Sequence, residues 1–492
     1  MSSELLQKAR EYEKKESQQV PEAQRPAYHV TAPVGWINDP NGFSRYRNWY
    51  HLFYQYHPYS THWGPMHWGH VRTRDFIKWE QLPAAIAPDE EYDKDGCFSG
   101  SALALPDGRQ LLMYTSVVRK EDSDGIVRDY QQQSVAFGDG TDYEKVEKNP
   151  VISTGMIPQK NDKHDFRDPK VFIEGDTVFS LVGNRSEDGS GELLLFESKD
   201  CIDWKLKTVV DRCNNEYGRM WECPDYFELE GKQILIVSPQ EMKADGGEFH
   251  PGNGTVLFVG ERNSDYSFKR ESVQTVDFGT DFYAPQTLES EDGRRIMIAW
   301  MQNWDTCNYA NHTRKIYGQM TLPRELFIKN GRVCQRPVRE IENYYGNIYN
   351  YKDAVIENET KLDGIKGRVL DMTVKLDLTK NESISCFRID ICKNEKYTTY
   401  FLLDLNKKTL KFSREKSGVY QDIITTREIE IQPENGMITL RLLLDKYSAE
   451  LFVNDGEKTL SSVVYTELEA DEITFWADKK AFADIEMKEI KI

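Results

Sequence analysis

The sequence predicts an all-β protein: a five-bladed β-propeller followed by a C-terminal β-sandwich, with a short N-terminal helix. From about residue 28 onward, apolar residues form short runs bounded by Gly, Asp, Asn or Pro, and no long helical pattern intervenes. A weak internal repeat recurs through the first part of the chain, and a second series of strands follows it. We therefore divide the 492 residues into a helical extension (1–27), a propeller (28–338) and a sandwich (345–492).

The N-terminal extension is predicted to be a short amphipathic helix packed on the body of the protein. Leu5, Ala9 and Tyr12 recur at helical spacing, and Pro21 follows the polar end of the segment. Residues 2–19 lack the apolar core of a secretory signal, and no later stretch is long and apolar enough to cross a bilayer. We expect a cytoplasmic protein without a membrane partner.

The strands predicted for the propeller are short. Alternate residues of Tyr50–Tyr56 point to opposite faces of the predicted strand. Other short apolar runs are Leu111–Tyr114, Leu193–Phe196, Ile234–Val237, Val256–Val259 and Ile296–Trp300.

The internal repeat predicts the blades. T-R-D-F-I-K-W-E at 73–80 resembles S-K-D-C-I-D-W-K at 198–205, with looser copies at 141–145 and 264–269. The aspartates of the copies, spaced 67, 58 and 65 residues apart, are Asp75, Asp142, Asp200 and Asp265. Such a period, with about four strands per unit, is typical of propeller blades, and about 300 residues give five of them. The alternative is that S-x-D-x-x-x-W is ordinary hairpin chemistry.

The pattern changes near residues 324–345, which hold Pro337 and the turn Asn330-Gly331. The strands predicted beyond this point are Val369–Leu378, Tyr400–Leu405, Leu440–Asp445, Glu450–Asn454 and Ile473–Ala477. The turn Asn454-Asp455-Gly456 is a strong hairpin signal. Strands at this spacing favour a second, sandwich-like domain.

Charge and cysteine content exclude several classes of function. A formal charge of −18 disfavours a nucleic-acid partner, and a phosphorylated substrate would need a local basic pocket. The eight cysteines form no C-x-x-C pair and are too sparse for a disulfide framework, so we expect reduced thiols. His62, His67 and His70 match no metal motif and are interpreted as core or supporting residues. We predict no metal site.

Two acidic motifs carry candidate anions. In W-I-N-D-P-N-G (36–42), Asp39 is expected on a turn where Asn38 and Asn41 can donate to its carboxylate and keep it ionised. In F-R-D-P-K (166–170), Arg167 beside Asp168 should lower the pKa of that carboxyl. The alternatives are an ordinary turn and a surface ion pair.

A third motif, M-W-E-C-P-D (220–225), carries a candidate general acid. Apolar neighbours such as Trp221 and Pro224 should raise the pKa of Glu222, although a buried glutamate paired with an arginine is the alternative. Two carboxyl groups with opposed pKa requirements are what glycoside hydrolysis needs. The aromatic residues found around these motifs are Trp36, Trp63, Trp68, Phe98, Trp221, Trp300 and Trp304.

Seven motifs in order carry a resemblance to a known family. They are W-I-N-D-P-N-G, F-Y-Q (53–55), W-G (63–64), F-S-G-S (98–101), F-R-D-P (166–169), W-E-C-P-D (221–225) and D-F-Y-A-P-Q (281–286). Together they resemble glycoside hydrolase family 32, which includes invertases, sucrose-6-phosphate hydrolases, inulinases and levanases. Residues 442–456 resemble the C-terminal sandwich of that family. The resemblance covers nearly the whole chain apart from the N-terminal helix.

The resemblance implies an active site in the axial funnel of the propeller. It implies that Asp39 is the nucleophile, Glu222 the acid/base, and Asp168 the group that stabilises the transition state. The residues expected to bind substrate are Trp36, Asn38, Gln55, Trp63, Phe98, Ser99, Arg167, Asp281, Tyr283 and Trp304. Retention of configuration would place the Asp39 and Glu222 carboxyls about 5–5.5 Å apart. No metal or organic cofactor is expected.

The predicted function is that of a retaining β-fructofuranosidase. It would release the terminal non-reducing β-D-fructofuranosyl unit of sucrose or sucrose 6-phosphate. The alternatives are an exo-acting inulin or levan hydrolase, fructosyl transfer by the same chemistry, or a catalytically silent fructan-binding protein. The presence of Asp39, Asp168 and Glu222 argues against the silent protein. The expected partners are sucrose, sucrose 6-phosphate or short fructans, and the sequence leaves the oligomeric state open.

Overall fold

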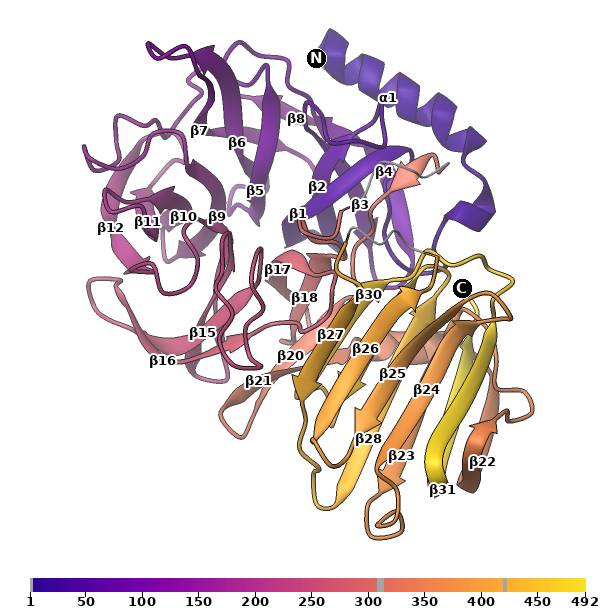
Figure 1. Ribbon diagram of the computed structural model, residues 1–492. Coiled ribbons are helices and arrows are strands. Elements are labelled where there is room, and N and C mark those ends of the chain that lie inside the picture. Colours follow the sequence, from indigo (N-terminus) through magenta and orange to yellow (C-terminus); the bar gives the residue numbers. More distant parts are fainter. Residues whose placement is uncertain (1–2, 308–313, 419–422) are drawn as a thin grey trace.

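Five antiparallel sheets of about four strands form a ring in the first two thirds of the chain (Figure 1). The computed structural model describes residues 3–307, 314–418 and 423–492. Blade 1 contains β1 (Gly35–Tyr46), β2 (Trp49–His57), β3 (His67–Thr73) and β4 (Trp79–Ile86). Blade 2 contains β5 (Gly96–Ala104), β6 (Gln110–Glu121), β7 (Val127–Gly138) and β8 (Tyr143–Lys145).

The remaining blades follow in chain order. Blade 3 contains β9 (Phe166–Glu174), β10 (Thr177–Arg185), β11 (Gly191–Ser198) and β12 (Trp204–Arg212). Blade 4 contains β13 (Trp221–Leu229), β14 (Lys232–Pro239), β15 (Val256–Arg262) and β16 (Phe268–Thr275). Blade 5 contains β17 (Tyr283–Glu289), β18 (Arg295–Trp300), β20 (Arg324–Lys329) and β21 (Arg332–Pro337). The predicted five-bladed propeller is therefore confirmed.

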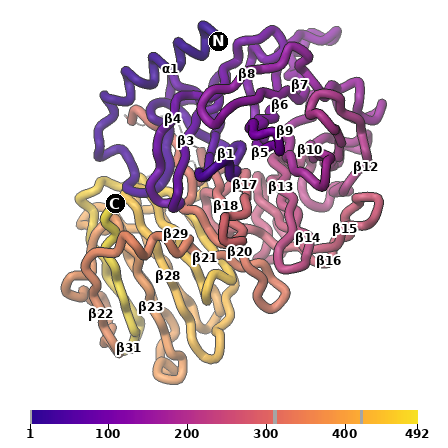
Figure 2. Tube along the Cα trace, turned by 180° about the vertical axis from the view of Figure 1, so that it is seen from behind, coloured from indigo at the N-terminus to yellow at the C-terminus, as the bar shows by residue number. Residues whose placement is uncertain are grey.

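The first strand of each blade faces the axis. β1, β5, β9, β13 and β17 contact one another in that order, and β17 returns to β1. The ring is closed by β19 (Ile316–Tyr317), which pairs in parallel with Gly35 and Trp36 of β1. Figure 2 shows the same ring from behind. Side chains from five distant segments of sequence therefore converge at the axis.

The sequence repeat lies in the turn between the third and fourth strands of a blade. Asp75 Oδ1 accepts hydrogen bonds from the backbone of Ile77 and Lys78, and Asp200 does the same two blades later. Both interpretations of the repeat therefore hold, because an aspartate turn of this kind recurs in blades 1 to 4. In blade 2 the aspartate with this role is Asp139, and not Asp142 as the spacing suggested.

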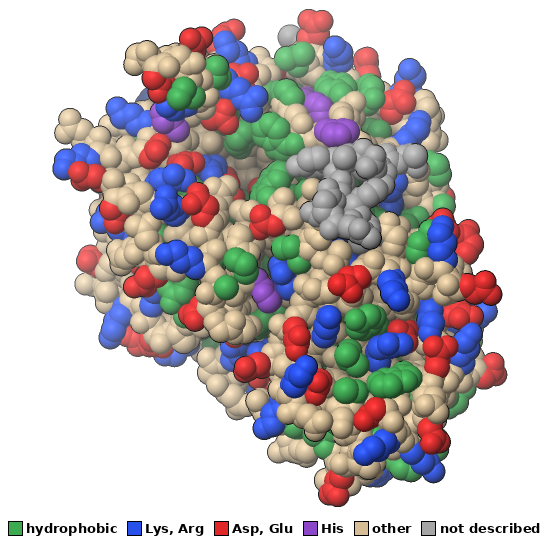
Figure 3. Space-filling model, in the orientation of Figure 1, with side chains coloured by type: hydrophobic (Ala, Val, Ile, Leu, Met, Phe, Trp, Pro, Cys, Tyr) green, Lys and Arg blue, Asp and Glu red, His purple; other side chains and the backbone are tan. Residues whose placement is uncertain are grey.

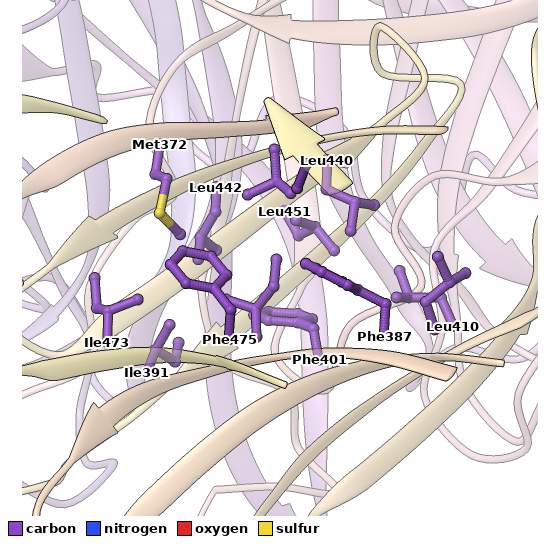
Figure 4. Close-up of a cluster of buried hydrophobic side chains, with 14 of the residues drawn as sticks. Met372, Phe387, Ile391, Phe401, Leu410, Leu440, Leu442, Leu451, Ile473 and Phe475 are labelled. Atoms are coloured by element: carbon purple, nitrogen blue, oxygen red, sulfur yellow. The ribbon is translucent and has the colours of Figure 1, made fainter. Parts of the chain in front are cut away.

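Beyond the propeller, ten strands form one curled, sandwich-like antiparallel sheet. They are β22 (Tyr345–Thr360), β23 (Leu370–Asp377), β24 (Cys386–Lys393), β25 (Thr398–Asp404), β26 (Thr409–Lys416), β27 (Thr426–Glu430), β28 (Met437–Asp445), β29 (Ser448–Val453), β30 (Lys458–Val463) and β31 (Glu472–Ile490). The long β31 pairs with β22, β23 and β24, so one strand joins different parts of the curl. Figure 4 shows Met372, Phe387 and Phe475 within the apolar core that the curl encloses.

The N-terminal helix α1 (Glu4–Glu16) packs on blade 1, although with a different face from the one predicted. Leu6, Ala9 and Glu13 are buried, whereas Leu5 is 47% exposed. Arg10 Nε donates to the Ala84 carbonyl, and Glu13 Oε1 accepts from the Ala84 amide. The helix thus covers the open edge of β4. Glu13 lies on the buried face of the helix because it accepts a hydrogen bond from the unpaired Ala84 amide of that edge. The short 3₁₀ helices are η1 (Ser17–Gln19), η2 (Glu22–Gln24) and η3 (Arg339–Tyr344).

Buried ion pairs join the propeller to the curled sheet. Arg324 contacts Asp277 (2.8 Å) and Glu450, and all three side chains are nearly or fully buried. His29, ahead of β1, lies between Glu450 (2.7 Å) and Asp445 (2.8 Å) of the second domain. Because these charged groups are buried away from water, each is stabilised by its oppositely charged partners, and loss of a partner would leave an uncompensated buried charge.

Two of the three histidines discussed above lie in the core as interpreted, whereas His62 is exposed. All eight cysteines are unpaired thiols. His67 and His70 are buried, and His70 Nε2 lies 2.9 Å from His51 Nδ1. Within residues 3–307, 314–418 and 423–492, no group of three or more His, Cys, Asp or Glu side chains could hold a metal, and no helix is suited to crossing a membrane.

Candidate active site

A pocket of about 990 Å³ opens where the innermost strands begin. It is lined by residues of all five blades: Asn38, Asp39, Gln55, Trp63, Phe98, Ser99, Arg119, Val127, Arg128, Asp129, Gln131, His164, Asp165, Arg167, Asp168, Glu222, Gln240, Asn253 and Trp304. All three predicted carboxyl groups are among them. Asp39 comes from β1, Asp168 from β9 and Glu222 from β13.

The innermost strands share an irregularity at the functional residues. A proline lies one or two positions after Asp39, Asp168, Glu222 and Tyr283: these prolines are Pro40, Pro169, Pro224 and Pro285. The strand ladders shift register at these points, and Gly100 marks the equivalent shift in blade 2. Proline is tolerated because these strands have a free inner edge, which in β1 begins after the short β19 pairing at Gly35 and Trp36, and there its missing N–H costs no ladder hydrogen bond. A bulge re-aims the preceding side chain, so Asp39 lies in a bulged strand and not on the predicted turn.

Asp39 is a buried carboxyl with few donors. Its Oδ2 accepts from Ser99 Oγ (2.7 Å) and lies 3.5 Å from Cys223 Sγ, while Oδ1 has no hydrogen-bond partner in the described part of the chain. Asn41, expected to donate to it, instead accepts from the Gly100 amide. Burial, with help from the nearby Glu222 charge, raises the pKa of Asp39 to about 6, against the Ser99 hydrogen bond.

Asp168 has a left-handed backbone conformation (φ of +66°), which residues other than glycine rarely adopt. Its Oδ2 accepts from the Cys223 amide (3.0 Å), and its own amide donates to Thr115 Oγ1 (2.9 Å). The expectation that Arg167 lowers the pKa of Asp168 is wrong as a net effect. Burial and the charges of Glu222 and Asp39 outweigh the arginine and raise this pKa. A strained backbone held in this way is typical of functional sites.

Glu222 is surrounded by polar groups, contrary to the expectation from its sequence neighbours. Arg167 donates to Glu222 Oε1 from Nε (3.1 Å) and Nη2 (2.9 Å), and the Tyr283 hydroxyl donates to Oε2 (2.5 Å). Trp221 points the other way, into the core of blades 3 and 4, where its Nε1 donates to the Tyr217 carbonyl. The cause is strand alternation, which sends successive side chains to opposite faces.

Aromatic side chains form the remaining walls. Trp63 meets the Phe98 ring edge to face, with centroids 5.8 Å apart. Trp304 stacks on Trp36 at 6.2 Å, and Trp36 in turn stacks on Tyr317 at 5.2 Å. Flat apolar walls around hydrogen-bonding groups suit the amphipathic faces of a sugar ring.

Three predicted substrate-binding residues do not line the pocket. Trp36, Tyr283 and Asp281 are fully buried behind its wall. Trp36 Nε1 donates to Asn38 Oδ1 (2.7 Å), and Tyr283 reaches Glu222, so both support residues that face the pocket. Asp281 instead binds Arg414 of the second domain at 2.6 Å. Their sequence motifs place them near the axis, but only the packing shows which way each side chain points.

The sequence interpretation missed a group of charged residues at the mouth of the pocket. Arg119, Arg128 and Asp129 come from the β6–β7 hairpin, and His164 comes from the segment before β9. The signal for the hairpin is the turn D-S-D-G at 122–125 between strands of alternating residues. Nothing in the sequence shows that the flank of this hairpin faces the central pocket.

Comparison with known proteins identifies the family. The model of the glycosyl hydrolases family 32 N-terminal domain matches residues 29–337, and that of the C-terminal domain matches residues 340–491. The chain belongs to glycoside hydrolase family 32. It is thus a glycoside hydrolase of the β-fructofuranosidase type.

Several named proteins are similar to this chain over most of its length. A raffinose invertase of Escherichia coli is 33% identical over 463 residues, covering 92% of each chain. A sucrose-6-phosphate hydrolase of the same species is 34% identical, covering 92% of this chain and 91% of the other. The solved GH32 β-fructofuranosidase of Bombyx mori is 30% identical with a TM-score of 0.84, covering 99% of this chain and 98% of the other.

Proposed function

We propose that this family 32 enzyme hydrolyses the terminal non-reducing β-D-fructofuranosyl unit of sucrose or sucrose 6-phosphate with retention of configuration. The observation that carries the proposal is the convergence of Asp39, Asp168 and Glu222 in one pocket, with different partners for each. The named activities of the relatives, sucrose-6-phosphate hydrolase and raffinose invertase, support the substrate class. A variant of the Bombyx mori enzyme has been solved in complex with sucrose.

In the first step, a carboxylate oxygen of Asp39 attacks the anomeric carbon of the fructosyl unit. Glu222, protonated, gives its proton to the leaving oxygen, and the bond to the leaving sugar breaks. A carboxylate with few donors is a better nucleophile than a fully solvated one, and Asp39 fits this requirement. Above a pH of about 6 it is ionised, as attack requires.

In the second step, Glu222 takes a proton from a water molecule, which attacks the anomeric carbon; the bond to the Asp39 oxygen breaks and the Asp39 carboxylate is released. Arg167 binds one Glu222 oxygen and Tyr283 the other, so the carboxyl is held in one orientation through both steps. Asp168, anchored by the Cys223 amide, faces the same pocket and would hold hydroxyl groups of the fructosyl ring. Hydrogen bonds to sugar hydroxyls that strengthen in the transition state lower the barrier.

The test is steady-state kinetics on sucrose, sucrose 6-phosphate and a short inulin oligomer, with Asp39→Asn and Glu222→Gln as controls. We expect turnover by the wild type and losses of roughly 10³-fold or more in both variants. Early product analysis by NMR should show β-fructofuranose before mutarotation, since two displacements retain configuration. If the wild type binds these sugars without turnover, the fructan-binding alternative takes its place.

An exo-acting fructan hydrolase is the second candidate. The observation that favours it is the pocket volume of about 990 Å³, which lies near the upper end of the range for small-molecule sites. A higher kcat/KM for the inulin oligomer than for sucrose would establish it.

We also propose that the enzyme works in the cytoplasm. The support is its content of eight unpaired thiols, six of them in buried residues, which suits a reducing compartment. Fractionation of cells producing the tagged chain tests this, and recovery of the active enzyme outside the cytoplasm would contradict it.

A further inference from the structure

The β6–β7 hairpin forms one wall of the pocket mouth. Arg119 on β6 and Val127, Arg128 and Asp129 on β7 line the pocket, and the hairpin turn covers residues 122–126. Val127 is 61% exposed, so the hairpin extends into solvent beside the entrance. If the fructosyl unit lies at the three carboxyl groups, as the proposed function requires, the leaving sugar would project toward this hairpin.

Each arginine of the hairpin is already paired with carboxylates of the same hairpin. Arg128 Nη1 contacts Asp122 (2.6 Å) and Asp124 (2.9 Å), and its Nη2 contacts Asp124 again (2.6 Å). The Tyr130 hydroxyl also donates to Asp122. The contacts with Arg128 lower the pKa of Asp124 to about 2, so this carboxyl is charged at neutral pH.

Arg119 is held in the same way. Its Nε donates to Asp129 (2.9 Å), its backbone amide donates to Asp95 (2.7 Å), and its guanidinium lies 5.6 Å from the Trp63 ring centroid. His164, the other basic side chain at the mouth, lies 3.7 Å from Asp122. Each basic side chain at the mouth thus has an acidic partner.

The rest of the pocket is acidic as well. The charged residues that line it are Arg119, Arg128 and Arg167 against Asp39, Asp129, Asp165, Asp168 and Glu222. Arg167 is engaged by Glu222 and Asp165. Segments 1–2, 308–313 and 419–422, which lie outside the described residues, contain no lysine or arginine. On the face shown in Figure 3, basic and acidic side chains are interspersed, without a continuous basic patch among the described residues.

We propose that the acidic residues of the β6–β7 hairpin select against a phosphorylated leaving sugar, so that the preferred substrate is an uncharged sucrose-type sugar. This inference rests on the proposed fructosidase function. A sugar phosphate carries a charge of about −1.5 to −2 at pH 7 and needs a free cation. At this mouth it would meet Asp129, which lines the pocket, and Arg128, which is already paired with Asp122 and Asp124 just outside the lining.

The selection works through charge and not through the strength of the ion pairs. Arg128 and Asp124 are partly exposed, with 31% and 47% of their side chains accessible. Such pairs are individually weak, and a phosphate could break them. The displaced carboxylates would nevertheless remain beside the phosphate, and like charges placed together disfavour that ligand against a neutral one.

The test compares kcat/KM for sucrose 6-phosphate with kcat/KM for sucrose, because the ratio cancels effects common to both. We expect the wild type to favour sucrose by roughly tenfold or more at low salt, and the preference to shrink as salt screens the charges. In the double variant Asp122→Asn, Asp124→Asn, the ratio should move toward the phosphorylated sugar by roughly tenfold. The double variant Asp176→Asn, Asp203→Asn, an equal change of charge on two exposed turns of blade 3, should leave the ratio unchanged.

The wild-type preference separates this proposal from a phosphate site at Arg128. Under the proposal the wild type favours sucrose, and Arg128→Gln, which leaves Asp122 and Asp124 without their cationic partner, should lower the ratio further. A wild type that prefers sucrose 6-phosphate, and loses that preference in Arg128→Gln, would show that Arg128 anchors phosphate and would overturn the proposal. If neither sugar is turned over by the wild type, the proposed function itself fails, which is a different outcome from a reversed preference.

Discussion

The reactivity of Asp39 depends on how few groups stabilise its charge. Ser99 supplies the short hydrogen bond to the carboxyl, and burial opposes ionisation. Because the nucleophile must be ionised, kcat/KM should fall as pH drops below about 6. This acidic limb of the kcat/KM profile reports the pKa of Asp39 in the free enzyme.

Ser99→Ala should move that limb to higher pH. The hydroxyl stabilises the anion, so its removal raises the pKa of Asp39, by about one unit for a hydrogen bond to a charged group. The pH dependence of kcat/KM measures the shift. Ser134→Ala removes a buried hydroxyl that bonds Ser116 and serves as the control, which should leave the limb in place. An unchanged limb in Ser99→Ala would show that Asp39 does not set it.

Tyr283 is a positioning residue for Glu222. Burial and the Glu222 charge keep the pKa of Tyr283 well above its usual value, so the hydroxyl remains a donor. Tyr283→Phe should lower kcat by about 10- to 100-fold and change KM little, since a hydrogen bond to a charged group is lost and the ring stays. Tyr226→Phe, which removes a buried hydroxyl without a partner in the described chain, is the matched control. An equal loss in both variants would indicate general disruption.

At the scale of elements, the site depends on how closely β10 approaches the innermost strands. A Cβ on Gly183 would lie 2.5 Å from the Trp221 carbonyl oxygen and 3.3 Å from the Arg167 carbonyl oxygen. These residues adjoin Glu222 and Asp168. The absence of a side chain at Gly183 therefore fixes the spacing of two carboxyl groups from different blades.

Gly183→Ala should reduce both stability and activity. We expect a loss of about 1–3 kcal/mol in the free energy of unfolding, as for other overpacked sites, and a fall in kcat because β9 and β13 must move apart. Denaturant unfolding and kinetics measure the two effects. Gly155→Ala is the control, because its nearest contact would be the Ser153 hydroxyl at 3.5 Å. Full activity in Gly183→Ala would mean that the strands adjust freely.

At the scale of the whole molecule, buried charges join the two domains. His29 donates from both ring nitrogens to Asp445 and Glu450 only when it is doubly protonated. Although burial disfavours the charge, the two carboxylates raise the pKa of His29 to about 9. The folded-state pKa lies above the unfolded value of about 6.5, so the stabilisation is complete below pH 6.5 and is lost as pH rises through 9.

The domain interface should therefore weaken in alkali. The pKa shift corresponds to about 3 kcal/mol, so we expect the Tm of the wild type to fall between pH 7 and 10. His29→Gln should lower Tm at pH 7 and flatten this dependence. His62→Gln, at an exposed position, should behave like the wild type. A wild-type slope that persists in His29→Gln would assign the effect to other groups.

The sequence by itself determined the all-β class and the repeat of the blades, and its motifs named three carboxyl groups that line one pocket. These are local properties, because turn chemistry, alternation and short motifs are written in neighbouring residues. The inner-strand prolines at 40, 169, 224 and 285 are a further signal of this kind, which could have located the innermost strands.

Only the tertiary structure decided which groups surround each carboxyl. Glu222 meets Arg167 and Tyr283 from blades 3 and 5, while its neighbour Trp221 turns into the core. Asp281 shares its motif with Tyr283 but pairs with Arg414 of the second domain. The physical reason is that adjacent side chains on a strand point to opposite faces, and closure of the ring decides what lies on each face.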